Sequence, residues 1–179
     1  MLSKSIIKLI DEAIVPAAAL IVGKMIGFFI ATYALGLSFT VAGGTVLGVL
    51  PSISFGSLKD YIIAENYSNI TMLTVVVVGN LYVLVRAHFF HESHIKPSFH
   101  AKLASMNMEG FVAPTYHLYH QAVIWLAFLW LTTGFLLVST VILKVTHPMI
   151  SIAALLIAAN FTWILSVDIE NEIEISKQA

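Results

Sequence analysis

The chain has 179 residues, of which 59% are hydrophobic and 11% are charged, and its formal net charge is −1. Soluble domains carry about 25% charged residues, so this composition is typical of a membrane protein. The near-zero charge excludes a nucleic-acid-binding surface, and the absence of cysteine excludes disulfides, iron–sulfur clusters, c-type haem attachment and thiolate zinc sites.

Four apolar runs are long enough to cross a bilayer, whose hydrocarbon core of about 30 Å needs roughly 20 apolar residues per helix. They cover about residues 13–42, 70–90, 115–145 and 149–167. Little sequence is left for a soluble domain. We therefore expect a single membrane domain over residues 1–179, folded as an all-α, antiparallel four-helix transmembrane bundle.

The first helix is expected to begin as an interfacial segment over residues 2–10, where isoleucines and lysines alternate at helical spacing. It continues through Pro16, which is tolerated near the start of a span. Small residues then recur every four positions, at Ala19, Gly23, Gly27 and Ala31. Such a stripe lets another helix approach closely in a membrane, and we expect it to serve packing inside the bundle.

Lys24 lies within the first apolar run. We expect its long side chain to snorkel to the membrane surface on the N-terminal side. The alternative is that Lys24 meets an anionic group, such as a haem propionate, a lipid phosphate or a carboxylate of a partner subunit. All ten acidic residues lie outside the four runs. Since ion-coupled carriers usually depend on an intramembrane carboxylate, this makes a proton- or sodium-coupled carrier a less favoured function.

The connections follow from glycine and proline positions. Residues 45–58 are rich in glycine and serine, so we expect a plain loop there, with a re-entrant or interfacial segment as the alternative. The second helix should end before Pro97, and the third should start at Pro114. The acidic tail, residues 168–175, either extends the fourth helix or forms a strand against a partner.

Four spans place both termini and the loop between the second and third helices on one side of the membrane. That side holds most of the positive residues, namely Lys4, Lys8, Arg86, Lys96, Lys102 and Lys177, whereas the other side holds Lys59 and Lys144. The positive-inside rule therefore predicts that both termini face the cytoplasm or its equivalent. We expect a multi-pass protein of an inner cell membrane or an organellar membrane.

The most distinctive feature is a group of histidines where the second and third runs meet: His88, His91, His94, His100, His117 and His120. Residues three apart share a helix face, so the first three form a stripe ending the second helix, and the last two form a pair starting the third. A helix N-terminus disfavours imidazolium. His117 and His120 should therefore stay neutral, which is the form that binds metal.

Three interpretations of these histidines remain open. A b-type haem would be held by His88 or His91 together with His120, with Arg86 available for the propionates. A non-haem transition metal would be held by His91, His94, His117 and His120 with Glu92. The third interpretation is a plain interfacial belt, because histidine, tyrosine and tryptophan all suit the membrane surface.

No pattern in the sequence indicates catalysis. We expect a small integral subunit of a larger membrane complex of the electron-transfer or oxidoreductase type. It would lie in the lipid bilayer among other membrane subunits, with a haem or metal at the histidine face. One alternative is a stand-alone transporter or channel for a metal ion or small solute. The second alternative is a membrane metalloenzyme that uses the histidines.

Overall fold

The computed structural model describes residues 4–46, 50–90 and 95–178. This part of the chain forms α1 (Lys4–Leu35), β1 (Phe39–Val46), β2 (Leu50–Phe55), α2 (Leu58–Phe89), α3 (Pro97–Ser105), a 3₁₀ turn (Glu109–Phe111), α4 (Thr115–Val141) and α5 (Pro148–Gln178). The four long helices, α1, α2, α4 and α5, are long and apolar enough to cross a membrane. The predicted all-α membrane bundle is confirmed.

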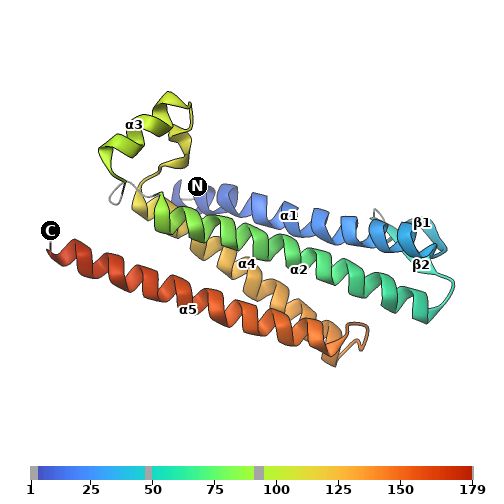
Figure 1. Cartoon of the computed structure of the whole chain (residues 1–179). Helices are drawn as coiled ribbons and strands as arrows, with labels where there is room; N and C mark the ends of the chain where they lie inside the picture. The colour runs from blue at the N-terminus through green and yellow to red at the C-terminus, as the bar shows by residue number, and fades with distance from the viewer. Residues whose placement is uncertain (1–3, 47–49, 91–94, 179) are drawn as a thin grey trace.

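The four long helices run back and forth beside one another (Figure 1). α2 and α4 form the centre, α1 packs mainly against α2, and α5 packs mainly against α4. α1 and α5 therefore flank the central pair on opposite sides. Both termini and α3 lie at one end of the bundle, which we call the histidine end, and the strands lie at the other, the hairpin end (Figure 1).

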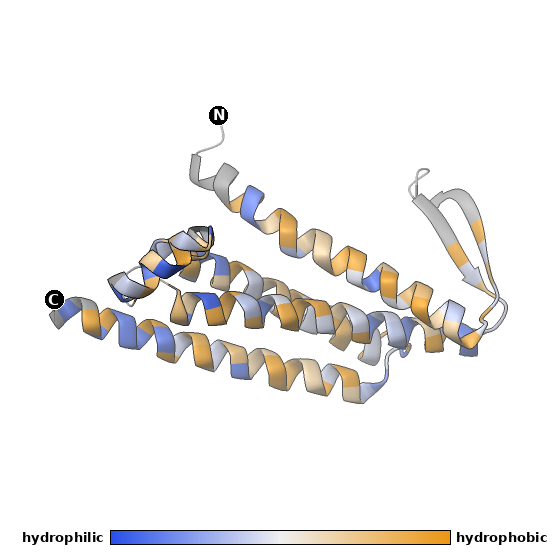
Figure 2. Ribbon diagram, turned by 45° about the horizontal axis from the view of Figure 1, so that its top comes forward, coloured by the Kyte–Doolittle hydropathy of each residue, from blue (hydrophilic) through white to orange (hydrophobic). Residues whose placement is uncertain are grey.

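The core lies between the central pair and α5. Val76 of α2, Leu129 and Leu136 of α4, and Ala154 and Ala158 of α5 are fully buried there. Many large apolar side chains of α1 and α5 face outward instead. Figure 2 shows hydrophobic residues along the length of both helices, with hydrophilic residues near the C-terminal end of α5. An exposed apolar surface of this extent is the one expected against lipid.

The small-residue stripe of α1 lies against α2, as expected for packing within the chain. A Cβ atom on Gly27 would lie 2.8 Å from Cα of Ser68, and one on Gly23 would lie 3.0 Å from Cγ2 of Val75. Ser68 also donates a hydrogen bond of 2.7 Å to the carbonyl oxygen of Lys24. Close approach of two helices where apolar burial supplies no driving force requires such small residues.

The connection between α1 and α2 is an antiparallel hairpin, so the plain loop expected over residues 45–58 is wrong. α1 ends at Leu35, Gly36 takes a positive φ of 61°, and Phe39 then pairs with Phe55. The rings of Phe39 and Phe55 lie 5.8 and 5.4 Å from that of Phe28 in α1. The valines, threonines and isoleucine among the glycines favour strands, and the aromatic contacts fix the hairpin to the bundle.

Two helices extend beyond their apolar runs. α2 begins at Leu58, where the side chain of Ser57 accepts a hydrogen bond of 3.1 Å from the backbone of Asp60. Glu65 therefore lies within the candidate span Leu58–Phe89, and the expectation that every carboxylate lies outside the spans is wrong. α5 continues as helix through the acidic tail to Gln178, which decides between the two alternatives for that tail.

Candidate functional site

Of the described histidines at the histidine end, His88 lies on one side of the central pair and His117 and His120 lie on the other, while His100 is exposed on α3 and belongs to neither group. His88 of α2 and Tyr119 of α4 both contact Asp168 of α5. His117 and His120 of α4 both contact Glu12 of α1. Since α1 and α5 flank the α2–α4 pair on opposite sides, these residues form two sites that share α4.

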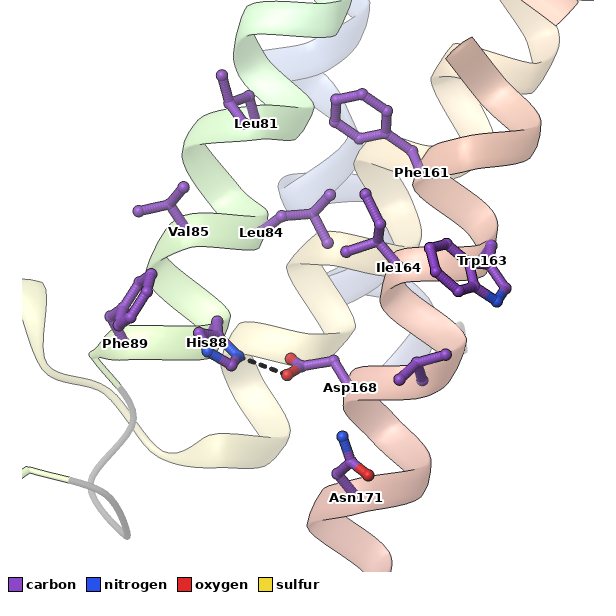
Figure 3. Close-up of a pocket in the computed structure, with 11 residues that line it drawn as sticks. Leu81, Leu84, Val85, His88, Phe89, Phe161, Trp163, Ile164, Asp168 and Asn171 are labelled. Carbon is purple, nitrogen blue, oxygen red and sulfur yellow. Dashed lines mark hydrogen bonds and ion pairs between the residues drawn. The ribbon is translucent and has the colours of Figure 1, made fainter. Parts of the chain in front are cut away.

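The first site is a hydrogen-bonded series of imidazole, carboxylate and phenol. Nδ1 of His88 lies 2.6 Å from Oδ1 of Asp168 (Figure 3), and the Tyr119 hydroxyl donates to Oδ2 at 2.7 Å. A carboxylate only accepts hydrogen bonds, so Nδ1 carries a proton and Nε2 keeps its lone pair in the neutral ring. The Asp168 side chain is 16% exposed and that of His88 is 55% exposed. The carboxylate is thus held in place and the imidazole is accessible.

An apolar groove of about 390 Å³ lies beside this pair, between α2 and α5 (Figure 3). α5 packs mainly on α4 and touches α2 much less, which leaves a space between α2 and α5. The apolar lining consists of Leu81, Leu84, Val85, Phe89, Phe161, Trp163, Ile164 and Val167. The polar lining residues are His88, Asp168 and Asn171, all at the histidine end of the groove. The groove therefore has a polar end and an apolar body.

The second site is a single carboxylate between two imidazoles. Oε1 of Glu12 lies 3.3 Å from Nδ1 of His117, and Oε2 lies 3.2 Å from Nε2 of His120. The ring of Tyr116 stacks on His120 with centroids 5.9 Å apart. Glu12 was absent from the predicted site because it is distant in sequence, although it directly precedes the first apolar run on the same membrane side.

The predicted metal ligands are only partly described, because His91, Glu92 and His94 lie outside the described residues. His117 and His120 do lie close together, but the carboxylate that they share is that of Glu12 and not the predicted Glu92. Within residues 4–46, 50–90 and 95–178, no three histidine, aspartate or glutamate side chains are arranged to hold a metal ion. The metal site therefore stays a prediction.

The contacts of Arg86, His88 and His120 do not support a haem held between the two imidazoles. His88 and His120 face carboxylates on opposite flanking helices. Arg86 donates from Nη2 to the carbonyl oxygen of Gly110 at 2.8 Å and from Nε to that of Phe111 at 3.0 Å. The guanidinium, predicted to bind propionates, thereby holds the 3₁₀ turn against the end of α2.

Lys24 contacts a carboxylate of the same chain toward the hairpin end. Its Nζ atom lies 2.6 Å from Oε1 of Glu65 and donates to Oδ1 of Asn69 at 2.8 Å. Asn69 in turn donates to Oγ1 of Thr146 at 2.8 Å, and Oγ of Ser139 lies 2.7 Å from that hydroxyl. The expectation that Lys24 snorkels to the N-terminal surface is wrong, because Glu65 and Asn69 provide closer partners.

Comparisons with protein-family models, with curated protein sequences and with solved structures found no match for the chain. The four long apolar helices make it a multi-pass membrane protein. Its function is therefore inferred from the two histidine–carboxylate sites, the groove and the series of hydrogen-bonded polar side chains that begins at Lys24.

Proposed function

We propose that the protein is a small integral subunit of a larger membrane complex of the electron-transfer or oxidoreductase type. The observation that carries this proposal is the series His88–Asp168–Tyr119 at the end of the apolar groove between α2 and α5. Imidazole, carboxylate and phenol groups in hydrogen-bond contact are the groups that proteins use to accept and release protons. Electron transfer at a membrane surface is commonly accompanied by such proton movement.

The acidic end of α5 supports the partner subunit in this proposal. α5 has 31 residues, which corresponds to about 46 Å at 1.5 Å per residue, whereas the hydrocarbon core is about 30 Å thick. The helix therefore extends beyond the apolar layer, and Glu170 and Glu174 are exposed on the extension. A regular helix with exposed carboxylates is suited to contact a basic surface of another subunit.

Native purification tests the proposal. We expect the protein, extracted from its own membrane in mild detergent, to migrate with other subunits well above the mass of its 19.6 kDa chain. The double variant Glu170→Lys/Glu174→Lys should weaken this association, and Lys144→Glu at the hairpin end should not. Migration as a lone monomer or homodimer would contradict the subunit function. An absorption spectrum and metal analysis of the same sample test the haem and metal predictions.

The chain of polar groups at the hairpin end favours a second candidate function, transport of a metal ion or small solute. Glu65 is a carboxylate within a candidate span, and it connects through Lys24 and Asn69 to Thr146. Ionisable groups within a span, or at its edge as here, often mark ion pathways. Flux into liposomes that contain only this protein, lost in Glu65→Gln and in His117→Ala/His120→Ala, would favour transport over the subunit function.

A further inference from the structure

The groove between α2 and α5 has a polar end and an apolar body. Asp168 and Asn171 lie three residues apart on α5, hence on one face, and His88 reaches Asp168 from α2. From His88 back to Leu81 the lining is apolar over about 10 Å, at 1.5 Å per residue. The matching ligand is an amphiphile whose polar head lies at the histidine end and whose tail points into the membrane.

The charge at the polar end selects against a phosphate head. Asp168 is the charged group that lines the groove, and Glu170 and Glu174 follow on the same helix. A second anion within a few ångströms of these carboxylates is repelled, and the repulsion is stronger at a membrane surface than in bulk water. A neutral head with hydroxyl or carbonyl groups avoids this cost.

The hydrogen-bonding groups specify that head further. Nδ1 of His88 is engaged by Asp168, which Tyr119 also contacts, so Nε2 is the ring nitrogen left for a ligand. In the neutral imidazole this nitrogen accepts a hydrogen bond, as from a ring hydroxyl. Phe89 of α2 and Trp163 of α5 both line the groove, at its two edges, and are both more than half exposed (Figure 3), so each offers an aromatic face to a bound ring.

We propose that the groove binds an isoprenoid quinol. One ring hydroxyl donates to Nε2 of His88, and the tail lies along Leu84 and Ile164. A quinol would be the ligand of the proposed electron-transfer function, and only its role in the complex rests on that proposed function. Binding itself is a property of this chain alone and is tested on it.

The test is a titration of the purified full-length chain, in phosphatidylcholine nanodiscs under anaerobic conditions, with decylubiquinol as the probe. We expect saturable quenching of tryptophan fluorescence, most of it lost in Trp163→Phe. His88→Gln should weaken binding by about tenfold, the loss that corresponds to one hydrogen bond to a polarised group. Ile164→Phe, which fills the groove, should weaken it at least as much. The matched control is His147→Gln, at the hairpin end, with unchanged binding.

Two outcomes would overturn the proposal. One is equal binding by the natural chain and His88→Gln, and the other is displacement of the probe by decanol at the same concentrations, which would make the groove an acyl-chain site. Because His88 is exposed, its variant should fold even if Asp168→Asn does not. Probe binding by a chain that migrates alone would support the ligand and contradict the subunit function, so the two failures are distinguishable.

Discussion

Lys24 and Glu65 form an ion pair between α1 and α2, with Nζ 2.6 Å from Oε1 and side chains 32% and 14% exposed. Glu65 lies about 10 Å along α2 from Leu58 at 1.5 Å per residue. α2 has 32 residues, or about 48 Å, against a hydrocarbon core of about 30 Å. The pair therefore lies near the edge of the apolar layer at the hairpin end, where it ties α1 to α2.

Removing one member of this pair should cost more stability than removing both. Lys24→Met leaves the Glu65 carboxylate without its cation, at a cost of about 1–3 kcal/mol. The double variant Lys24→Met/Glu65→Gln removes both charges and should recover part of that loss. Thermal unfolding in detergent measures the difference, with Lys59→Met, at an exposed position of α2, as the control. A double variant less stable than Lys24→Met would contradict the pairing.

Gly27 should tolerate no side chain, in contrast to Gly134. A Cβ atom on Gly27 would lie 2.5 Å from Oγ1 of Thr71 and 2.8 Å from Cα of Ser68, whereas one on Gly134 would meet no atom within 4 Å. We expect Gly27→Ala to lower the free energy of unfolding by about 1–3 kcal/mol, since α1 must shift away from α2. Gly134→Ala should be neutral or raise it by up to about 1 kcal/mol, because alanine favours helix. Equal effects of the two substitutions in the same detergent assay would refute the packing role of Gly27.

The four apolar helices were predictable from sequence because each is a local property of about 20 consecutive residues, but their ends were not: α1 stops at Leu35 before strand β1, and α2 begins at Leu58. The packing of Gly23 and Gly27 within the chain was predictable for the same reason, since their spacing defines one helix face. The partners of the histidines were not predictable. Glu12 and Asp168 are distant from the histidines in sequence and come into contact with them only because of the order in which the helices pack. Lys24 was misplaced because its partner Glu65 lies outside the second apolar run and belongs to α2 only because that helix begins earlier, at the Ser57 cap.

The contact of Glu12 with His117 and His120 should hold the first half of α1 against α4. Glu12→Gln removes the charge while keeping the size of the side chain. We expect amide hydrogen exchange in residues 9–23 to accelerate by about tenfold, which corresponds to about 1.4 kcal/mol. Asp11→Asn is the matched control, because Asp11 is the adjacent acidic residue and is exposed. Equal acceleration in both variants would show that a general loss of negative charge, and not the two imidazoles, is responsible.

The orientation of the bundle can be tested directly because the chain contains no cysteine. Ala101 of α3 is exposed at the histidine end, and Ser38, between α1 and β1, is exposed at the hairpin end. The excess of lysine and arginine at the histidine end predicts that this end faces the cytoplasm. In intact cells, a membrane-impermeant maleimide should therefore modify Ser38→Cys and leave Ala101→Cys unmodified, and inside-out vesicles should give the opposite pattern. Modification of Ala101→Cys in intact cells would place both termini, and with them His88 and Asp168, on the outer side. The acidic end of α5 would then have to meet its partner there.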